Sequence, residues 1–366
     1  MHLHIVSFNV PWPADYGGVI DVFCRLKALV EAGVRVHLHC YTYGREKSKE
    51  LAELCEEVCY YPRETGLRHQ LERRPYIVAS RNSERLIERL RQDDYPILLE
   101  GLHDCFVLER LADGRRKILV RAHNVEHDYY RALAHAEKHL WKKLFFLAES
   151  RKLEHYEPVL TKATCVLPIS EKDAQHFVAI GCPQVMVLPP SHGHSRVVSP
   201  LGRGEYVLYQ GNLSVPENIR AVEYIVRNLV SVTEYQFVVA GRDPGADLRH
   251  LLERYDNVTL VANPSEEHMN GLLAGAQVNI LVTDQATGVK LKLMNALYES
   301  RFCLVNGKMV EGTGLGEACV VADTPEQMLQ SLERLMTAEF TEDERRRREK
   351  VLVEGDSLED LKNILF

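Results

Sequence analysis

Short apolar runs alternate with segments of helical spacing along most of the chain. Each run is almost continuously apolar, which is typical of strands in a parallel sheet whose two faces are covered by helices. In the first half, helical spacing is clear over 19–32 and 171–180. The strands predicted for that half are 3–8, 34–40, 96–100, 117–121, 164–168 and 184–188. This alternation predicts right-handed crossovers and an open, doubly wound sheet.

The pattern breaks at residues 189–204, which are rich in Pro, Gly and Ser and have no periodicity. We therefore predict a domain linker at 191–204. The alternation then restarts, and a helix at 217–229 carries its apolar positions on one stripe. The strands predicted for this half are 206–210, 235–240, 257–261, 277–282, 301–306 and 318–321.

The fold class predicted by this organisation is α/β, with two doubly wound, Rossmann-like domains at 1–190 and 205–345. We expect the C-terminal helices at 346–366 to cross back onto the first domain, and we interpret the charged run from 341 as a solvated face. Open α/β sheets bind ligands beyond the carboxyl ends of their strands. A functional cleft between two facing domains is therefore expected.

Composition narrows the class of protein. Of 366 residues, 45% are hydrophobic and 27% are charged, which excludes a disordered chain, a collagen and a small disulfide scaffold. The net charge of -7 argues against a nucleic-acid binder. Nine scattered cysteines predict a reducing compartment without disulfides. Since no signal peptide or membrane-spanning run is recognisable, we expect a cytoplasmic protein that can still touch a membrane surface.

Two features of the first half could contribute chemistry. Gly17 and Gly18 precede a helix, where backbone amides could hold an anion or a sugar, although a simple tight turn explains this loop at least as well. His123 follows the strand at 117–121, where its side chain could donate to a hydroxyl or a phosphate or simply cap the turn. With Glu126 and His127 it also spells an inverted zinc-protease pattern. That pattern needs both histidines on one helix face and a third ligand, so we predict no metal.

The second half carries a basic helix start. Thr287 and Gly288 precede a helix whose first turn contains Lys290 and Lys292. Lysines there oppose the helix dipole, a placement that makes sense if an anion such as a diphosphate is bound, although the lysines could also simply extend into solvent. Further on, Glu311 and Gly312 lie in a glycine-rich loop at 305–318, which could bring amides and a carboxylate to a ligand or serve as a plain connection.

Several familiar signatures are absent from the sequence. It has no Walker pattern, no His-Glu-x-x-His, no Asp-x-Asp and no Gly-x-Ser-x-Gly. A serine hydrolase and a transferase that holds a metal through Asp-x-Asp are therefore disfavoured.

Taken in order, the motifs resemble the retaining glycosyltransferases of family four, which have the GT-B fold. The matching segments are PWPADYGG, HNVEHDYY, PISEKDAQHF, YQGNLSVPENIRAVEYI, VVAGRDPGADL, GVKLKLMNALYESRFCLVN and EGTGL. They span nearly the whole chain in the order and spacing of the family.

This resemblance implies a nucleotide-sugar donor bound mainly by the second domain and an acceptor bound mainly by the first. It places Gly17 and Gly18 near the donor phosphates, His123 near the transferred sugar, and Lys290 and Lys292 on the diphosphate. It also brings further positions to the donor, namely Gly211, Asn212, Ala262, Asn263, Pro264, Thr287, Gly288, Asn295, Glu311 and Gly312.

The sequence departs from the family at three positions. Thr287 and Asn295 stand where the family often has two glutamates, and GNLSVPEN lacks the usual basic residue. Threonine and asparagine can still bond hydroxyls, but they bring no charge. The alternatives left open are a GT-B epimerase or phosphorylase, a catalytically silent nucleotide-sugar-binding subunit, and a zinc hydrolase.

The resemblance implies transfer of a hexose, mannose among the candidates, from a GDP- or UDP-sugar to a glycan or lipid-linked acceptor in bacterial surface polysaccharide or glycolipid synthesis. No metal, cofactor or nucleic acid is expected. The helix at 138–152 mixes Leu140, Trp141, Leu144 and Phe145 with lysines and could rest on anionic lipid, but we favour packing against its own domain. A basic patch of Arg63, Arg68, Arg73 and Arg74 could hold an anionic acceptor.

Overall fold

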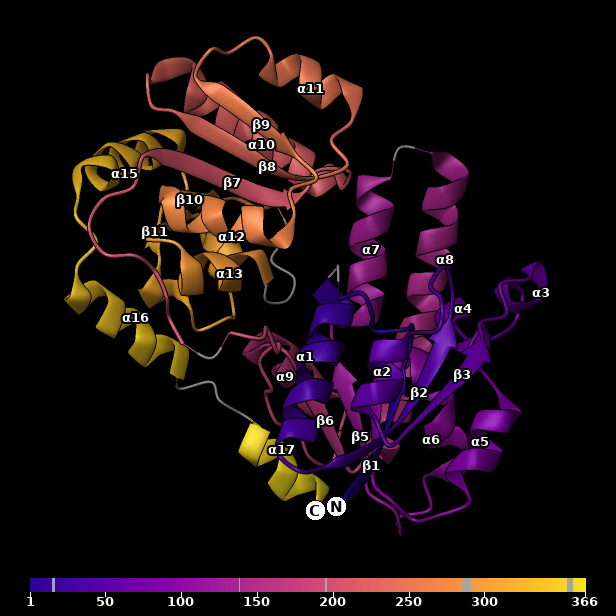
Figure 1. The fold of residues 1–366 in the computed structure, drawn as a ribbon. Coiled ribbons are helices and arrows are strands. Elements are labelled where there is room, and N and C mark those ends of the chain that lie inside the picture. Colours follow the sequence, from indigo (N-terminus) through magenta and orange to yellow (C-terminus); the bar gives the residue numbers. More distant parts are fainter. Residues whose placement is uncertain (15–16, 138, 195, 285–290, 354–357) are drawn as a thin grey trace. The chain divides into compact units, whose positions relative to one another are not determined.

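The computed structural model describes residues 1–14, 17–137, 139–194, 196–284, 291–353 and 358–366. The chain forms two α/β units, each built on a six-stranded parallel sheet (Figure 1). The first unit comprises Met1–Ser191 and Asp356–Phe366, and the second comprises His192–Gly355. Two six-stranded parallel sheets covered by helices match the predicted fold class.

The sheet of the first unit has the strand order β3-β2-β1-β4-β5-β6. The strands are β1 (His2–Ser7), β2 (Arg35–Thr42), β3 (Glu57–Pro62), β4 (Ile97–Glu100), β5 (Ile118–Ala122) and β6 (Cys165–Pro168). The sequence analysis missed β3, an edge strand that is mostly half-buried and whose apolar run is only four residues long. It was wrong about a strand at 184–188, where only Val185 forms an isolated bridge, with Val166. Gln184, Met186 and Leu188 do form backbone hydrogen bonds with β6, but Pro168 of β6 has no N–H to donate, so the ladder is interrupted.

Helices cover both faces of the first sheet. One core contains Leu26 of α1 and Leu361 of α17, and the other contains Ile87 of α5 and Leu153 of α8. The helices of this unit are α1 (Gly17–Glu31), α2 (Lys49–Leu54), α3 (Leu67–Gln70), α4 (Tyr76–Ala79), α5 (Glu84–Leu90), α6 (Phe106–Leu111), α7 (Glu126–Ala136), α8 (Leu140–Tyr156), α9 (Glu171–Ala179) and α17 (Leu358–Leu365).

The sheet of the second unit has the order β12-β11-β10-β7-β8-β9. The strands are β7 (Tyr206–Asn212), β8 (Phe237–Arg242), β9 (Val258–Ala262), β10 (Ala276–Leu281), β11 (Phe302–Val305) and β12 (Val320–Val321). The helices are α10 (Pro216–Asn228), α11 (Ala246–Leu252), α12 (Glu266–Gly275), α13 (Leu291–Glu299), α14 (Gly307–Val310), α15 (Pro325–Thr337) and α16 (Glu342–Val353). A Cβ on Gly241 would lie 1.8 Å from the carbonyl oxygen of Gly211, so the pairing of β7 with β8 requires glycine there.

The domain boundaries differ from the prediction in two places. Residues 192–204 belong to the second unit, where Val198 N–H donates to the Tyr298 carbonyl at 2.8 Å and Gly202 bridges with Phe340. An aperiodic segment can therefore pack through backbone hydrogen bonds and a few buried side chains such as Val197. The two C-terminal helices also separate, because α16 belongs to the second unit and only α17 packs on the first.

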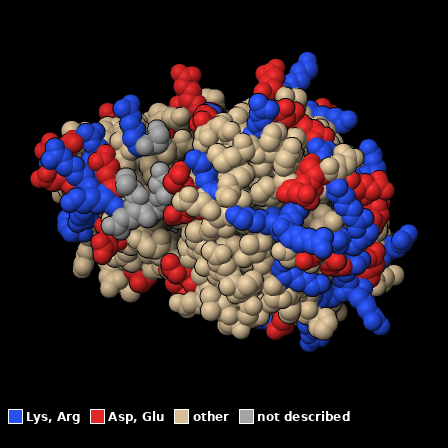
Figure 2. Space-filling model, turned by 90° about the horizontal axis from the view of Figure 1, so that it is seen from below, with Lys and Arg blue, Asp and Glu red and all other residues tan. Residues whose placement is uncertain are grey.

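The charged run in α16 is largely solvated, but Arg348 is an exception. This residue is 4% exposed, and its guanidinium donates to the carbonyls of Leu297, at 3.0 Å, and Ser300, at 2.6 Å. On the face drawn in Figure 2, acidic and basic side chains are interspersed rather than sorted by sign.

All nine cysteines are free thiols, and among the described residues no helix is both long and apolar enough to cross a bilayer.

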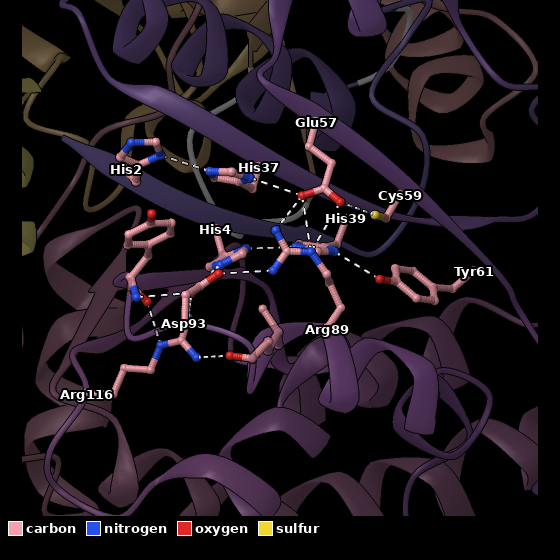
Figure 3. Close-up of polar contacts among 12 residues, drawn as sticks. His2, His4, His37, His39, Glu57, Cys59, Tyr61, Arg89, Asp93 and Arg116 are labelled. Carbon is pink, nitrogen blue, oxygen red and sulfur yellow. Dashed lines mark hydrogen bonds and ion pairs between the residues drawn. The ribbon is translucent and has the colours of Figure 1, made fainter.

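One face of the first sheet is unexpectedly polar near the amino ends of its strands. His2 and His4 on β1 face His37 and His39 on β2, with His4 Nδ1 at 2.8 Å from His39 Nε2 (Figure 3). Asp93 accepts from His4, Glu57 from His37, and the Tyr61 hydroxyl contacts His39, at 2.9, 3.1 and 3.0 Å. Burial lowers the pKa of His4 to about 4 and that of His39 to about 3. These rings are therefore neutral structural groups at neutral pH.

Candidate functional site

The carboxyl edge of the first sheet holds a buried cluster of charges. Arg25 on α1 donates to Asp21 at 2.5 Å and to Glu100, the last residue of β4, at 2.7 Å. Arg121 on β5 pairs with the other Asp21 oxygen at 3.1 Å. None of these four side chains is more than 3% exposed. Two guanidiniums and two carboxylates thus balance one another away from water.

His123 is the accessible member of this cluster. It follows β5, as predicted, and its side chain is 15% exposed. Its Nε2 lies 3.2 Å from Glu100 Oε2, and its Nδ1 lies 3.5 Å from Asp21 Oδ2. Burial alone would raise the pKa of Asp21, but Arg121 and Arg25 outweigh it and hold that pKa well below its usual range. Two carboxylates therefore fix the orientation of the ring.

The other first-unit predictions can be placed around this cluster. Gly17 and Gly18 are the first residues of α1, the helix that carries Asp21 and Arg25. The inverted zinc-protease pattern is not assembled, because His123 faces Asp21 and Glu100 whereas His127 Nδ1 lies 3.2 Å from Glu157.

The carboxyl edge of the second sheet is built from amides and a lysine. Lys292, in the first turn of α13, donates through Nζ to Asn218 Oδ1 at 2.8 Å and lies 3.4 Å from the Tyr209 hydroxyl. Its own carbonyl accepts from Gln210 on β7 at 2.6 Å. Asn218 Nδ2 in turn donates to the Asn212 carbonyl at 2.8 Å. The predicted Lys292 and Gly211-Asn212 are therefore brought to one place.

The remaining predicted donor residues are distributed along the loops of this edge. Asn263 follows β9 with φ of 52° and accepts from the Asp243 amide, after β8, at 2.9 Å. Asn295 Oδ1 accepts from His194 Nε2 at 2.9 Å, and His194 Nδ1 lies 3.4 Å from Glu299. Glu311 and Gly312 follow α14, Gly312 with φ of 71°. Thr287, Gly288 and Lys290 lie outside the described residues.

The acceptor-side features behave differently from the prediction. Leu140, Trp141 and Leu144, at the start of α8, are 72%, 70% and 58% exposed, so our preference for a packed stripe was wrong. Phe145 does contact Tyr76, with ring centroids 6.5 Å apart. The four arginines also do not form one free patch, because Arg74 pairs with Glu109 at 2.6 Å.

The sequence analysis missed the charged residues that surround His123. Asp21 and Arg25 are spaced i,i+4 on a helix, and Glu100 and Arg121 each follow an apolar strand run. A charge at the end of such a run falls at the carboxyl edge of the sheet. The positions of Glu100 and Arg121 at the ends of apolar runs could therefore have predicted that both lie near His123.

Comparisons with known proteins agree on the architecture. No family model matches the chain. A Klebsiella pneumoniae protein described as an uncharacterized 44.6 kDa protein in the cps region is 26% identical over 345 residues, 87% of each chain.

Among solved structures, the apo form of the lipopolysaccharide outer core galactosyltransferase WaaB has a TM-score of 0.68 at 12% identity, covering 100% of this chain and 99% of the other. The trehalose-6-phosphate synthase OtsA has a TM-score of 0.65 at 12% identity, with coverage of 100% and 99%. A glycosyltransferase from Rickettsia africae has a TM-score of 0.64 at 12% identity, with coverage of 100% and 95%. The chain therefore has the GT-B fold found in glycosyltransferase structures.

Proposed function

We propose that the protein is a retaining glycosyltransferase of family four type that uses a nucleoside-diphosphate sugar. The observation that carries this proposal is the joining of Lys292, Asn218 and the Gly211-Asn212 turn at the carboxyl edge of the second sheet. Hydrogen bonds to Asn218 and Tyr209 orient the ammonium. An ammonium beside a helix start and a glycine turn suits a diphosphate.

In the proposed reaction, Lys292 neutralises charge that grows on the departing diphosphate. Such contacts act mainly in the transition state, where they lower the barrier most. His123, whose two ring nitrogens face Asp21 and Glu100, is proposed to contact the transferred sugar, as the family resemblance implies. The fixed carboxylates keep the ring oriented, so little reorganisation is needed when the sugar binds. No protein nucleophile is assigned, and the transfer is proposed to need no metal.

The acceptor is proposed to be a glycan or lipid-linked molecule of bacterial surface polysaccharide or glycolipid synthesis. Similarity to a protein of a cps region and to a lipopolysaccharide galactosyltransferase supports this part. The exposed Leu140, Trp141 and Leu144 on α8, next to Lys142 and Lys143, support peripheral contact with the inner face of a membrane. Sedimentation with anionic vesicles tests this contact, and an equal bound fraction for Trp141→Ser and Leu144→Ser would refute it.

The donor part is tested with purified protein and a set of UDP- and GDP-hexoses, GDP-mannose included. We expect one of them to raise the melting temperature and to release its nucleoside diphosphate when acceptor extracts are added. Release should be lost in Lys292→Ala. If no nucleotide sugar raises the melting temperature and Lys292→Ala retains full activity, the proposal fails.

A second candidate is a catalytically silent nucleotide-sugar-binding subunit. Asn295 favours this candidate, because the side chain at this position is a neutral amide and not a charged group. The amide oxygen already accepts from His194. Tight nucleotide binding without release of diphosphate across a broad acceptor panel would support this candidate. An epimerase or phosphorylase would instead change the donor in incubations without acceptor, which product analysis detects.

A further inference from the structure

A second histidine–carboxylate cluster lies in the first unit, apart from the one around His123. It joins His127 at the start of α7, Glu157 at the start of the 3-10 helix Glu157–Lys162, and His176 on α9. Glu157 Oε2 lies 2.6 Å from His176 Nε2 and 3.2 Å from His127 Nδ1. One nitrogen of each histidine and one carboxylate oxygen all lie within 4.8 Å of one another.

These side chains are largely withdrawn from solvent. Glu157 is 3% exposed and His127 is 8% exposed, whereas His176 is 29% exposed and provides a path to solvent. The distal nitrogen of His127 lies 3.5 Å from Asp128, which also pairs with Arg131. A carboxylate behind a histidine is the arrangement that fixes the ring of a metal-bound histidine.

The two histidines share one buried carboxylate oxygen, Glu157 Oε2, and either a ring proton or a metal ion can lie between each ring nitrogen and that oxygen. If His127 keeps a proton on Nε2, toward Asp128, a neutral ring would direct the Nδ1 lone pair at an ionised carboxylate oxygen. A proton or a metal ion removes that repulsion.

The cluster around Glu157 differs from the cluster around His123 in how its carboxylates are neutralised. Asp21 and Glu100 are already neutralised by Arg25 and Arg121. Within the described part of the chain, no Lys or Arg forms an ion pair with Glu157. We propose that His127, Glu157 and His176 bind one Zn²⁺ ion that ties α7, the 3-10 helix and α9 together.

Two imidazoles and one carboxylate, with water as a fourth ligand, form a ligand set that Zn²⁺ accepts. Ligand atoms around tetrahedral zinc are about 3.3 Å apart, so the exposed His176 would move outward by somewhat less than 1 Å. The three ligands lie in the first unit, apart from Lys292 in the second, the residue on which the proposed donor site depends. The test of zinc binding is therefore independent of the proposed function.

The experiment titrates metal-stripped, full-length protein with Zn²⁺ alone, by calorimetry and by melting temperature. We expect one equivalent to bind and to raise the melting temperature. His176→Ala should weaken binding at least a hundredfold. Asp128→Asn, which keeps all three ligands, should weaken it roughly ten- to a hundredfold.

His250→Ala is the matched control, because His250 and Glu253 form a surface pair at 3.2 Å on another helix. It should bind zinc like the wild type. Co²⁺ substitution adds a spectroscopic readout, with tetrahedral absorption expected in the wild type and lost in His176→Ala. The proposal is overturned if the wild type binds no stoichiometric Zn²⁺, which leaves a proton between the groups. Equal binding by a folded His176→Ala protein would also overturn it, since the ion would then lie at another site.

Discussion

The carboxyl edges of the two sheets use charge in different ways. In the first unit, Asp21, Arg25, Glu100 and Arg121 are buried and compensate one another, and His123 is the member that solvent reaches. In the second unit, Lys292 is oriented by the neutral groups of Asn218 and Tyr209. A compensated cluster fixes a side chain in place, whereas a lysine at a helix start can contribute to binding an anion. We propose that the first edge positions a group and that the second binds the donor's charge.

The largest expected effect is on stability, at the first edge. Arg25→Ala leaves the carboxylates of Asp21 and Glu100 with one cation fewer in a buried site. Breaking such a pair costs about 3–5 kcal/mol in the free energy of unfolding. Urea denaturation measures the loss. Lys27→Ala is the control, because Lys27 lies on the same helix but is 58% exposed, and it should unfold like the wild type. Equal losses in the two variants would show that the cluster is not structural.

The next effect is on activity, at the second edge. Lys292→Ala should reduce kcat/KM for diphosphate release by roughly a hundredfold, about 3 kcal/mol, because a transition-state contact is lost. Its unfolding free energy should change little compared with Arg25→Ala. Lys350→Ala, an exposed lysine on α16 of the same unit, should retain full activity. If the two lysine variants behave alike, the second edge does not bind the leaving group.

Mild acid should destabilise the first unit more than the second. The pKa values of His4 and His39 lie below those of the unfolded chain, so their contribution to stability is present above pH ~6.5 and declines as the pH falls toward 4. At pH 5 the first unit should lose about 2 kcal/mol for each buried ring relative to pH 7.

Hydrogen exchange on peptides of β1–β2 and β7–β10, corrected for intrinsic rates, measures the difference between the units. Replacing His39 with Gln removes one titrating ring and should reduce the pH dependence. Equal losses of protection in both units would contradict the assignment of the neutral histidines as the acid-sensitive element.

The smallest effect is expected at Asn295. Its amide can offer the donor one neutral hydrogen bond, which is worth about 1 kcal/mol. Asn295→Ala should therefore raise the KM for the donor roughly fivefold and leave kcat nearly unchanged. Initial rates over a range of donor concentrations separate the two parameters. A loss as large as that of Lys292→Ala would mean that the amide has taken over the role of a charged group.

The fold was largely predictable because parallel strands are buried on both faces and so appear as apolar runs. That rule found β4 and β5 but missed β3, whose edge position leaves it half-buried. The position of His123 was predictable from the end of a strand. The groups that hold it come from α1 and β4, far apart in sequence, and only the folded chain shows Arg25 between Asp21 and Glu100. The zinc ligands were hidden for the same reason, since His127 was noted with His123 but contacts Glu157 instead.

Calorimetry with UDP and GDP, the nucleotide products of the expected donors, tests the central claim most directly. The account predicts that one of them binds the wild type, that Lys292→Ala weakens this binding roughly ten- to a hundredfold, and that Lys350→Ala leaves it unchanged. Failure of both nucleotides to bind, or equal affinity in the wild type and Lys292→Ala, would contradict the assignment of the second edge as the site of the donor diphosphate.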